Sequence, residues 1–216
     1  MARPRHPENA PGDWYVDTAC IDCGHCRVVA PEVYGDAGDH AIVRAQPTGD
    51  TRRAAMALVA CPVAAIGTDG EADLKGAVAA FPTEVLPDVF LVGFANERTF
   101  GASSWLVRRP GGNVLVDVPR ANAGLFRRIR ELGGVRWLFL THRDDVAGHE
   151  KIALEFGAVR VISRSVAWYS WSEQVRSIEK LLGVPFAHVL PGHGRPWHGT
   201  VERKDEAVRA FLARAP

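Results

Sequence analysis

Three of the four cysteines in this 216-residue chain lie within seven residues, and the fourth follows much later. Cys20, Cys23 and Cys26 form the pattern C-x2-C-x2-C, and Cys61 stands before a proline. Thiolates are ligands for soft and borderline metals, and thiols can also pair as disulfides. The spacing therefore indicates either a metal centre or a set of disulfide bonds.

An iron–sulfur cluster suits this spacing better than the two alternatives. Cysteines two residues apart are poorly placed to form a disulfide with each other. Structural zinc usually takes its ligands as two separated pairs, whereas this chain offers three cysteines and then one. A tight loop can bind three irons of a [4Fe–4S] cluster, and a remote cysteine can bind the fourth. The sequence favours one [4Fe–4S] cluster that uses all four cysteines.

The residues around the cysteines agree with such a cluster. Gly24 allows the backbone of the loop to approach the cluster closely. Pro62 begins a turn into the apolar sequence Val-Ala-Ala-Ile, which can cover the cluster. His25 lies inside the loop, where it could tune the cluster, but we expect an exposed side chain without such a role.

Two segments carry a resemblance to a known family. The sequences VDTACIDCGHCRVVAPEVYGDAGDHAIV and ALVACPVAAI resemble the single-cluster [4Fe–4S] ferredoxins of bacterial type, over about residues 14–67. The resemblance implies a small α+β unit that carries one electron at low potential and passes it to a redox partner protein. It implies strands near 14–17, 41–44 and 66–68, and helices near 27–30 and 51–60.

The rest of the chain alternates between strand and helix patterns. Residues 69–88 contain turn signals and two prolines, so we expect a linker between a domain at 1–68 and a domain at 89–216. A hairpin is expected around residues 110–113, because apolar runs flank the sequence Pro-Gly-Gly-Asn. Helices and strands then alternate to residue 216, which indicates α/β structure. The predicted fold class is α+β / α/β.

Two expected strand ends carry histidines, in FLTHRDDVAGHE and VLPGHG. Strand-end loops often carry chemistry, and imidazole with carboxylate suits zinc or iron. Together with SSWLVRRPGGNVLVDVP, these segments resemble the metallo-β-lactamase superfamily over roughly residues 85–200. The resemblance implies a shortened αββα domain and, where the metal site is complete, metal-dependent hydrolysis.

The chain departs from the metal motif of that superfamily, T-H-x-H-x-D-H. Without a gap, Asp144 stands where the motif has its second histidine. With one residue deleted, Asp145 matches the aspartate of the motif, and Val146 stands where the motif has its third histidine. A stretch of several dozen residues that supplies further ligands is missing. The candidates that remain for a second site, with zinc or iron, are His142, Asp145, His149 and His193, and Asp145 is the candidate catalytic residue.

Three functions follow from these observations. The first is an electron-transfer protein with an appended domain whose metal site is degenerate. The second is a ferredoxin-linked metallohydrolase or oxidoreductase with a rearranged zinc or iron site. The third is a protein in which the cluster is structural or senses redox state or oxygen. The substrate of a hydrolase cannot be read from the fold.

Composition excludes several other classes of partner. The formal net charge is +1, so nothing indicates a nucleic-acid partner. No apolar run approaches the roughly 18 residues of a membrane span, and the polar, proline-rich N-terminal tail around His6 does not resemble a secretory signal. We therefore expect a cytoplasmic protein, where thiols stay reduced.

Overall fold

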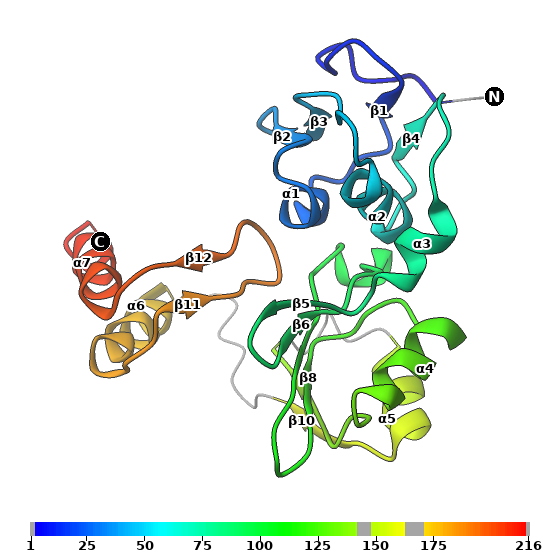
Figure 1. Ribbon diagram of the computed structural model, residues 1–216. Helices are drawn as coiled ribbons and strands as arrows, with labels where there is room; N and C mark the ends of the chain where they lie inside the picture. Colours follow the sequence, from blue (N-terminus) through cyan, green and yellow to red (C-terminus); the bar gives the residue numbers. More distant parts are fainter. Residues whose placement is uncertain (1–2, 142–147, 163–170, 215–216) are drawn as a thin grey trace. The chain divides into compact units, whose positions relative to one another are not determined.

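The computed structural model describes residues 3–141, 148–162 and 171–214. The chain forms two compact units. The larger contains Met1–Ser163 together with Gly192–Arg195, and the smaller contains Arg164–Pro191 and Pro196–Pro216. Strands and helices occur in both units (Figure 1). The predicted mixed α+β / α/β class is confirmed.

The N-terminal part of the larger unit has the small α+β architecture expected from the cysteine-rich segments. Strand β1 (Trp14–Val16) pairs antiparallel with β4 (Ile66–Thr68), and β2 (Tyr34–Asp36) pairs antiparallel with β3 (Ala41–Val43). The helices are α1 (His25–Val29) and α2 (Arg52–Ala60). The expected strands and helices are present, while β2 was not predicted, because Tyr-Gly-Asp has no alternating pattern.

The stretch predicted as a linker, 69–88, contains regular structure. It holds helix α3 (Leu74–Ala79) and strand β5 (Thr83–Leu86). Asp73 caps α3 by accepting a hydrogen bond from the Gly76 amide at 2.8 Å. β5 pairs antiparallel with β6 (Val89–Leu91), so this stretch is part of the sheet. The predicted division at residues 68 and 89 stays a prediction.

The largest sheet has six strands in the order β10-β9-β8-β7-β6-β5. Strands β5 to β8 are antiparallel neighbours, and β8, β9 and β10 are parallel. The predicted hairpin is the pair of β7 (Trp105–Val107) and β8 (Val114–Val116). The other two strands are β9 (Trp137–Leu140) and β10 (Val159–Ile162).

Two crossover helices cover one face of this sheet (Figure 1). Helix α4 (Ala123–Glu131) connects β8 to β9, and α5 (His149–Phe156) lies between β9 and β10 in the chain. The two helices lie side by side, because the rings of Phe126 and Phe156 meet edge to face at 5.4 Å. Leu138 is buried, whereas its neighbour Phe139 is 41% exposed on the other face.

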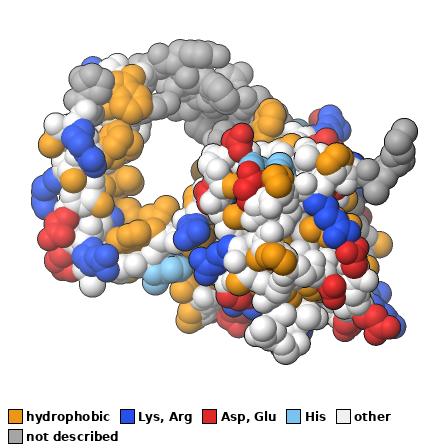
Figure 2. Space-filling model, turned by 90° about the horizontal axis from the view of Figure 1, so that it is seen from above, with side chains coloured by type: hydrophobic (Ala, Val, Ile, Leu, Met, Phe, Trp, Pro, Cys, Tyr) orange, Lys and Arg blue, Asp and Glu red, His pale blue; other side chains and the backbone are white. Residues whose placement is uncertain are grey.

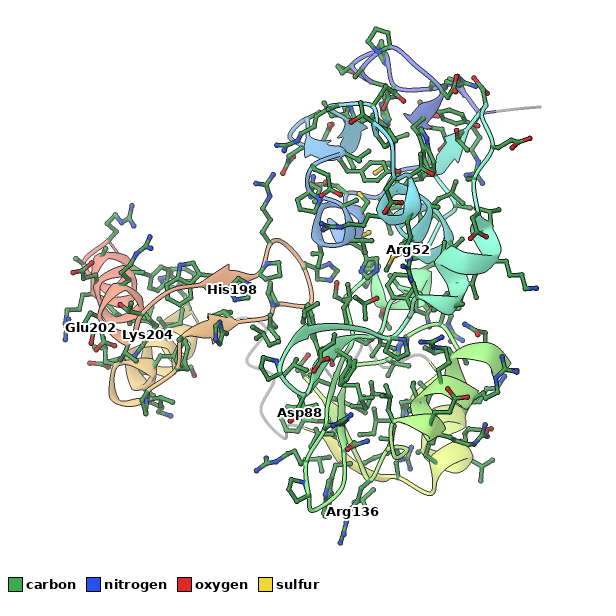
Figure 3. The ribbon with its side chains drawn as sticks, viewed as in Figure 1. Arg52, Asp88, Arg136, His198, Glu202 and Lys204 are labelled. Carbon is green, nitrogen blue, oxygen red and sulfur yellow. The ribbon has the colours of Figure 1, made fainter. Side chains whose placement is uncertain are left out.

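The smaller unit is built from two helices and a short β pair. It contains α6 (Trp171–Glu179), the 3-10 helix η2 (Lys180–Gly183), β11 (His188–Val189), β12 (Trp197–His198) and α7 (Val201–Leu212). Lys204, on α7 (Figure 3), is buried and donates a hydrogen bond to the Leu181 carbonyl at 2.6 Å. His188 and His198 face each other across β11 and β12, with their Nδ1 atoms 2.8 Å apart.

The surface is mixed in charge. On the face seen in Figure 2, acidic and basic side chains are interspersed with hydrophobic ones, which agrees with a net charge of +1. Within the described residues, no helix has the length and apolar character that crossing a membrane requires.

Candidate functional site

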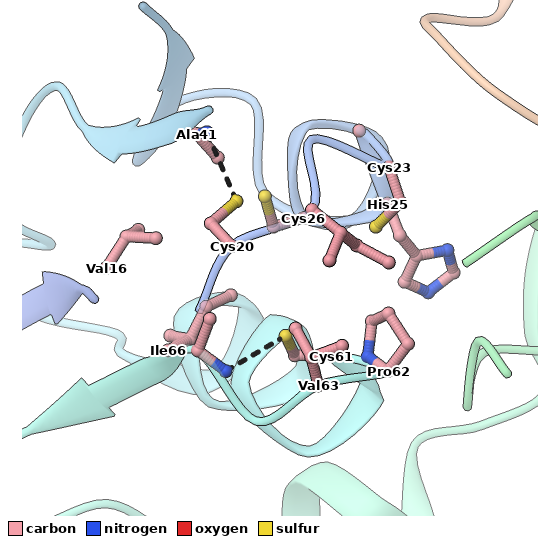
Figure 4. Close-up of a pocket in the computed structure, with 13 residues that line it drawn as sticks. Val16, Cys20, Cys23, His25, Cys26, Ala41, Cys61, Pro62, Val63 and Ile66 are labelled. Atoms are coloured by element: carbon pink, nitrogen blue, oxygen red, sulfur yellow. Dashed lines mark hydrogen bonds between the residues drawn. The ribbon is translucent and has the colours of Figure 1, made fainter. Parts of the chain in front are cut away.

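The four cysteines line one pocket in the larger unit. Figure 4 shows their sulfur atoms arranged around this pocket. The remaining wall is mainly apolar and is formed by Val16, Ile21, Ala41, Pro62, Val63, Ala65 and Ile66, with Gly24 and His25. The fold therefore brings the remote Cys61 to the three cysteines of the loop.

Two helix ends position the sulfur atoms. Cys26 lies in α1, and Cys20 and Cys23 lie in the loop before it. Gly24 precedes α1 with a φ of 76°, a left-handed conformation that favours glycine. Cys61 is the residue at which α2 ends, because a residue before proline disfavours the helical conformation.

A buried arginine fixes the cysteine loop to its surroundings. The Arg27 side chain is 8% exposed and forms ion pairs with Asp22 at 2.9 Å and Asp36 at 3.2 Å. Asp22 lies between Cys20 and Cys23, and Asp36 ends β2. Arg27 thus connects the loop to β2. Its positive charge lowers the pKa of the Cys23 and Cys26 thiols, but burial raises these pKa values by more.

Burial makes the free thiols weak acids. Removal from water raises the pKa of Cys23 to about 11, and it also raises the pKa of Cys26 and Cys61. A bound metal would stabilise several thiolates in this pocket, because its positive charge replaces their protons. The donor set therefore fits a metal centre with sulfur ligands, and we expect protons to be released when the site is loaded.

Backbone amides point at the sulfur atoms. The Ala41 amide donates to Cys20 Sγ at 3.4 Å, and the Ala65 amide donates to Cys61 Sγ at 3.3 Å (Figure 4). A hydrogen bond from the His25 amide lowers the pKa of Cys23. Such N–H groups stabilise negative charge on sulfur and are among the factors that set the potential of an iron–sulfur cluster. Four sulfurs, three of them with amide donors, fit a [4Fe–4S] cluster.

His25 is not the exposed loop side chain that we predicted. It is fully buried, and its Nδ1 lies 2.9 Å from Ser103 Oγ, 78 residues along the chain. Burial lowers the pKa of His25 to about 4, so the ring is neutral at physiological pH. Its Nε2 has no hydrogen-bond partner among the described residues. Ser103, the residue that orients this ring, carries no signal in the sequence.

The predicted second site is only partly described. Asp144 and the candidate ligands His142 and Asp145 lie outside the described residues. His149 begins α5 and accepts a hydrogen bond from Arg160 at its Nδ1, at 3.0 Å. His193 contacts the cysteine loop instead, because its Nδ1 donates to the Cys23 carbonyl at 3.4 Å. The set His142, Asp145, His149 and His193 stays a prediction.

Asp117 is a positioning residue that the sequence did not reveal. It follows β8 in a left-handed conformation with a φ of 58°, and it is buried. Its carboxylate accepts hydrogen bonds from the Thr141 amide at 2.8 Å and from the Thr141 hydroxyl at 2.8 and 2.9 Å. Asp117 thus holds the end of β9, directly before His142. A carboxylate after a buried strand is the only signal in the sequence.

Replacing Asp117 with alanine should destabilise the larger unit. The Asp117→Ala variant loses hydrogen bonds to a carboxylate and places alanine in a left-handed conformation, at a combined cost of about 3 kcal/mol. Asp117→Asn should cost about half as much, because asparagine tolerates this conformation and keeps one acceptor oxygen. Denaturant unfolding of the cluster-loaded protein measures the loss of stability in both variants. Equal losses would contradict the role of the Asp117 carboxylate as a hydrogen-bond acceptor.

Comparison with known proteins identifies the cysteine-rich part. Residues 16–68 match the family model described as the 4Fe-4S single cluster domain of Ferredoxin I. This match includes all four cysteines, the helices α1 and α2 and the strands β2, β3 and β4. A search among curated proteins finds no match.

Solved structures similar to this chain are metallo-β-lactamases. One, from Cronobacter sakazakii (Enterobacter sakazakii), has a HARLDQ motif and is 28% identical, with a TM-score of 0.31, over 44% of this chain and 38% of its own. Another is described as the first B3 metallo-β-lactamase with an active-site glutamic acid and is 23% identical, with a TM-score of 0.31, over 60% of this chain and 48% of its own. This chain spans less than half of the length of these enzymes. The match of the family model, with four cysteines around one pocket, makes residues 16–68 a single-cluster [4Fe–4S] ferredoxin domain.

Proposed function

We propose that this protein carries single electrons through one [4Fe–4S] cluster bound by Cys20, Cys23, Cys26 and Cys61. When bound, the cluster supplies a centre that takes up and releases one electron. The observation that carries the proposal is the pocket that all four cysteines line, with amide donors to the sulfurs of Cys20 and Cys61. The protein's own residues keep water from the sulfurs and stabilise the added negative charge.

The position of Ile21 supports an exchange of electrons with a protein partner. Ile21 lies between Cys20 and Cys23, lines the pocket, and is 43% exposed. An exposed apolar side chain beside the ligands gives a redox partner a contact surface close to the cluster. Transient redox complexes have small interfaces, so one such residue can change the rate of transfer strongly.

The cluster and its redox activity are tested on protein purified without oxygen. We expect four irons per chain and a reversible reduction by one electron in a potentiometric titration. Colourless protein after reconstitution with iron and sulfide, or a cluster that breaks down on its first reduction, contradicts the proposal. Breakdown on reduction would instead support a structural or sensing cluster.

Replacing Ile21 should slow electron transfer to a protein acceptor. With oxidised cytochrome c as the acceptor, the reduced cluster gives one electron and the haem iron goes from Fe³⁺ to Fe²⁺. We expect Ile21→Asp to lower this rate about tenfold, which corresponds to about 1.4 kcal/mol of lost contact energy. Stopped-flow absorption measures the rate.

Leu74→Asp is the matched control, because Leu74 on α3 is 45% exposed and does not line the pocket. Its rate should equal that of the unmodified protein. A small acceptor such as methyl viologen should react equally with both variants. Equal slowing by the two substitutions would mean that added negative charge, and not the contact at Ile21, controls the rate.

A second candidate is a ferredoxin-linked metallohydrolase or oxidoreductase. Two observations favour it: Asp117 holds the strand end before His142, and His193 contacts the carbonyl of Cys23. A metal bound by His193 would lie next to the cysteine loop. Zinc, or iron beyond the four of the cluster, that is lost in a His193→Ala variant would support this candidate.

A further inference from the structure

Two histidines and a glutamate come together outside the cysteine pocket. One ligand atom from each of His6, Glu8 and His40 lies within 4.8 Å of the other two. None of the three lines the pocket of the cysteines. It is the one group of three such side chains within this distance in the part of the chain that the structure describes. His6 is therefore not a residue of a free polar tail.

Asn9 locks together the two backbone segments that carry the histidines. Its side-chain amide nitrogen donates to the carbonyls of His6 at 2.7 Å and Val16 at 2.8 Å. Its oxygen accepts from the amides of Val16 at 3.1 Å and Val43 at 2.9 Å. One side chain thus joins the N-terminal segment to β1 and β3, and His40 directly precedes β3. The relative position of His6 and His40 is fixed by the fold.

One ring nitrogen of each histidine in this group lacks a hydrogen-bond partner among the described residues. The Nε2 atoms of His6 and His40 are both buried, and neither has a hydrogen-bond partner among the described residues. The two rings stack with their centroids 3.7 Å apart and an angle of 13° between their planes. A buried polar atom without a partner costs free energy. A cation that binds both nitrogens would remove this cost.

An acidic residue prepares His40 to act as a ligand. Asp39 Oδ1 lies 2.6 Å from His40 Nδ1. The carboxylate favours the tautomer with its proton on Nδ1, which leaves the lone pair of Nε2 free. Metal-binding histidines are commonly oriented by a carboxylate in this way. Glu8 Oε2 lies 3.6 Å from His40 Nε2, so a negatively charged ligand lies close to this nitrogen.

We propose that His6, Glu8 and His40 bind one divalent first-row cation, for which zinc is the best match. Two imidazoles and a carboxylate are a ligand set of catalytic and transport zinc sites, with water in the fourth position. The rings turn out of their parallel stack on binding, so that both lone pairs point at the ion. The site is distinct from the cluster and does not depend on it for ligands.

The experiment is a calorimetric titration of the cluster-loaded protein with zinc sulfate under nitrogen. We expect one binding event that is weakened at least 100-fold in His40→Ala and in His6→Ala. X-ray absorption at the zinc edge should show nitrogen and oxygen ligands at about 2.0–2.1 Å and no sulfur. The visible spectrum of each variant reports whether the cluster and its domain are intact.

Exposed variants keep the test independent of folding. The side chains of Asp39 and Glu8 are 91% and 52% exposed, so Asp39→Asn and Glu8→Gln leave the core unchanged. Loss of the orienting carboxylate should lower the zinc affinity about 10–100-fold. Glu71→Gln, an exposed acid of the same unit, is the matched control for Glu8→Gln and should bind as the unmodified protein does.

His198→Ala separates this site from the histidine pair of the smaller unit. It removes one partner of the contact between His188 and His198, and the binding event should persist. The proposal is overturned if zinc binding is lost in His198→Ala, or if His6→Ala, His40→Ala and Glu8→Gln all leave the isotherm unchanged. Sulfur ligands at the zinc edge would also overturn it.

Discussion

The Cys61→Ala variant should bind three irons per chain or fewer, where the unmodified protein binds four. Cys61 is the fourth sulfur of the pocket and the only ligand from outside the loop of Cys20 to Cys26. Without it, one iron of the cluster has no protein ligand and is lost to solvent. We expect a weak visible spectrum and a lower midpoint of thermal unfolding, because metal binding at buried cysteines contributes to folding.

A neighbouring substitution controls for general damage to the pocket. Val63 lines the same wall but offers no ligand, so Val63→Ala should keep four irons per chain. Iron and sulfide analysis, read with the visible spectrum, measures both variants. Four irons per chain in Cys61→Ala would contradict the ligand set proposed here and require a different fourth ligand.

The Gly101→Ala variant should lose cluster occupancy although residue 101 is not a ligand. Gly101 has a φ of 77°, and a Cβ atom there would lie 2.4 Å from Cys23 Cβ and 2.7 Å from its sulfur. The clash displaces the sulfur, and the left-handed conformation adds strain. Together these effects should cost about 3 kcal/mol of stability and at least halve the iron content.

Gly49→Ala isolates the contribution of the backbone. Gly49 has nearly the same φ, 74°, but nothing lies within 4 Å of a Cβ atom placed there. It should cost only about 1 kcal/mol, from the left-handed conformation alone, and keep four irons. The unfolding free energies and iron contents of Gly101→Ala and Gly49→Ala distinguish the clash with Cys23 from backbone strain. Similar losses in both would show that strain, and not the contact with Cys23, is responsible.

Features that depend on local sequence patterns could be predicted better than features that depend on contacts between distant residues. The gathering of the four cysteines around one pocket could be predicted because three of them are close in sequence and Cys61 is the only cysteine left. Helix α2 could be predicted from its apolar spacing, and the β7–β8 hairpin from its glycine turn. For the helix and the hairpin, the signal and the structure lie within about a dozen residues of each other.

Burial by distant segments could not be predicted. His25 was expected to be exposed, because nothing near it in sequence indicates that Ser103 will cover it. His6 lies in a polar stretch, and its position depends on Asn9, which reaches β1 and β3. Residues 69–88 carry two prolines and yet add a helix and an edge strand. Each of these outcomes depends on tertiary contacts that override local composition.

The contacts of Cys23 and His25 with residues 101 and 103 affect how separable the ferredoxin domain is. Both contacts cross from the matched segment, 16–68, into the segment between β6 and β7. Arg120 adds a third, by donating to the Val59 carbonyl at 3.0 Å. In a fragment that ends at residue 68, the buried imidazole of His25 would be exposed to water. One side of Cys23 would also be exposed. We therefore expect residues 16–68 to depend on the segment around residues 101–120 for their stability.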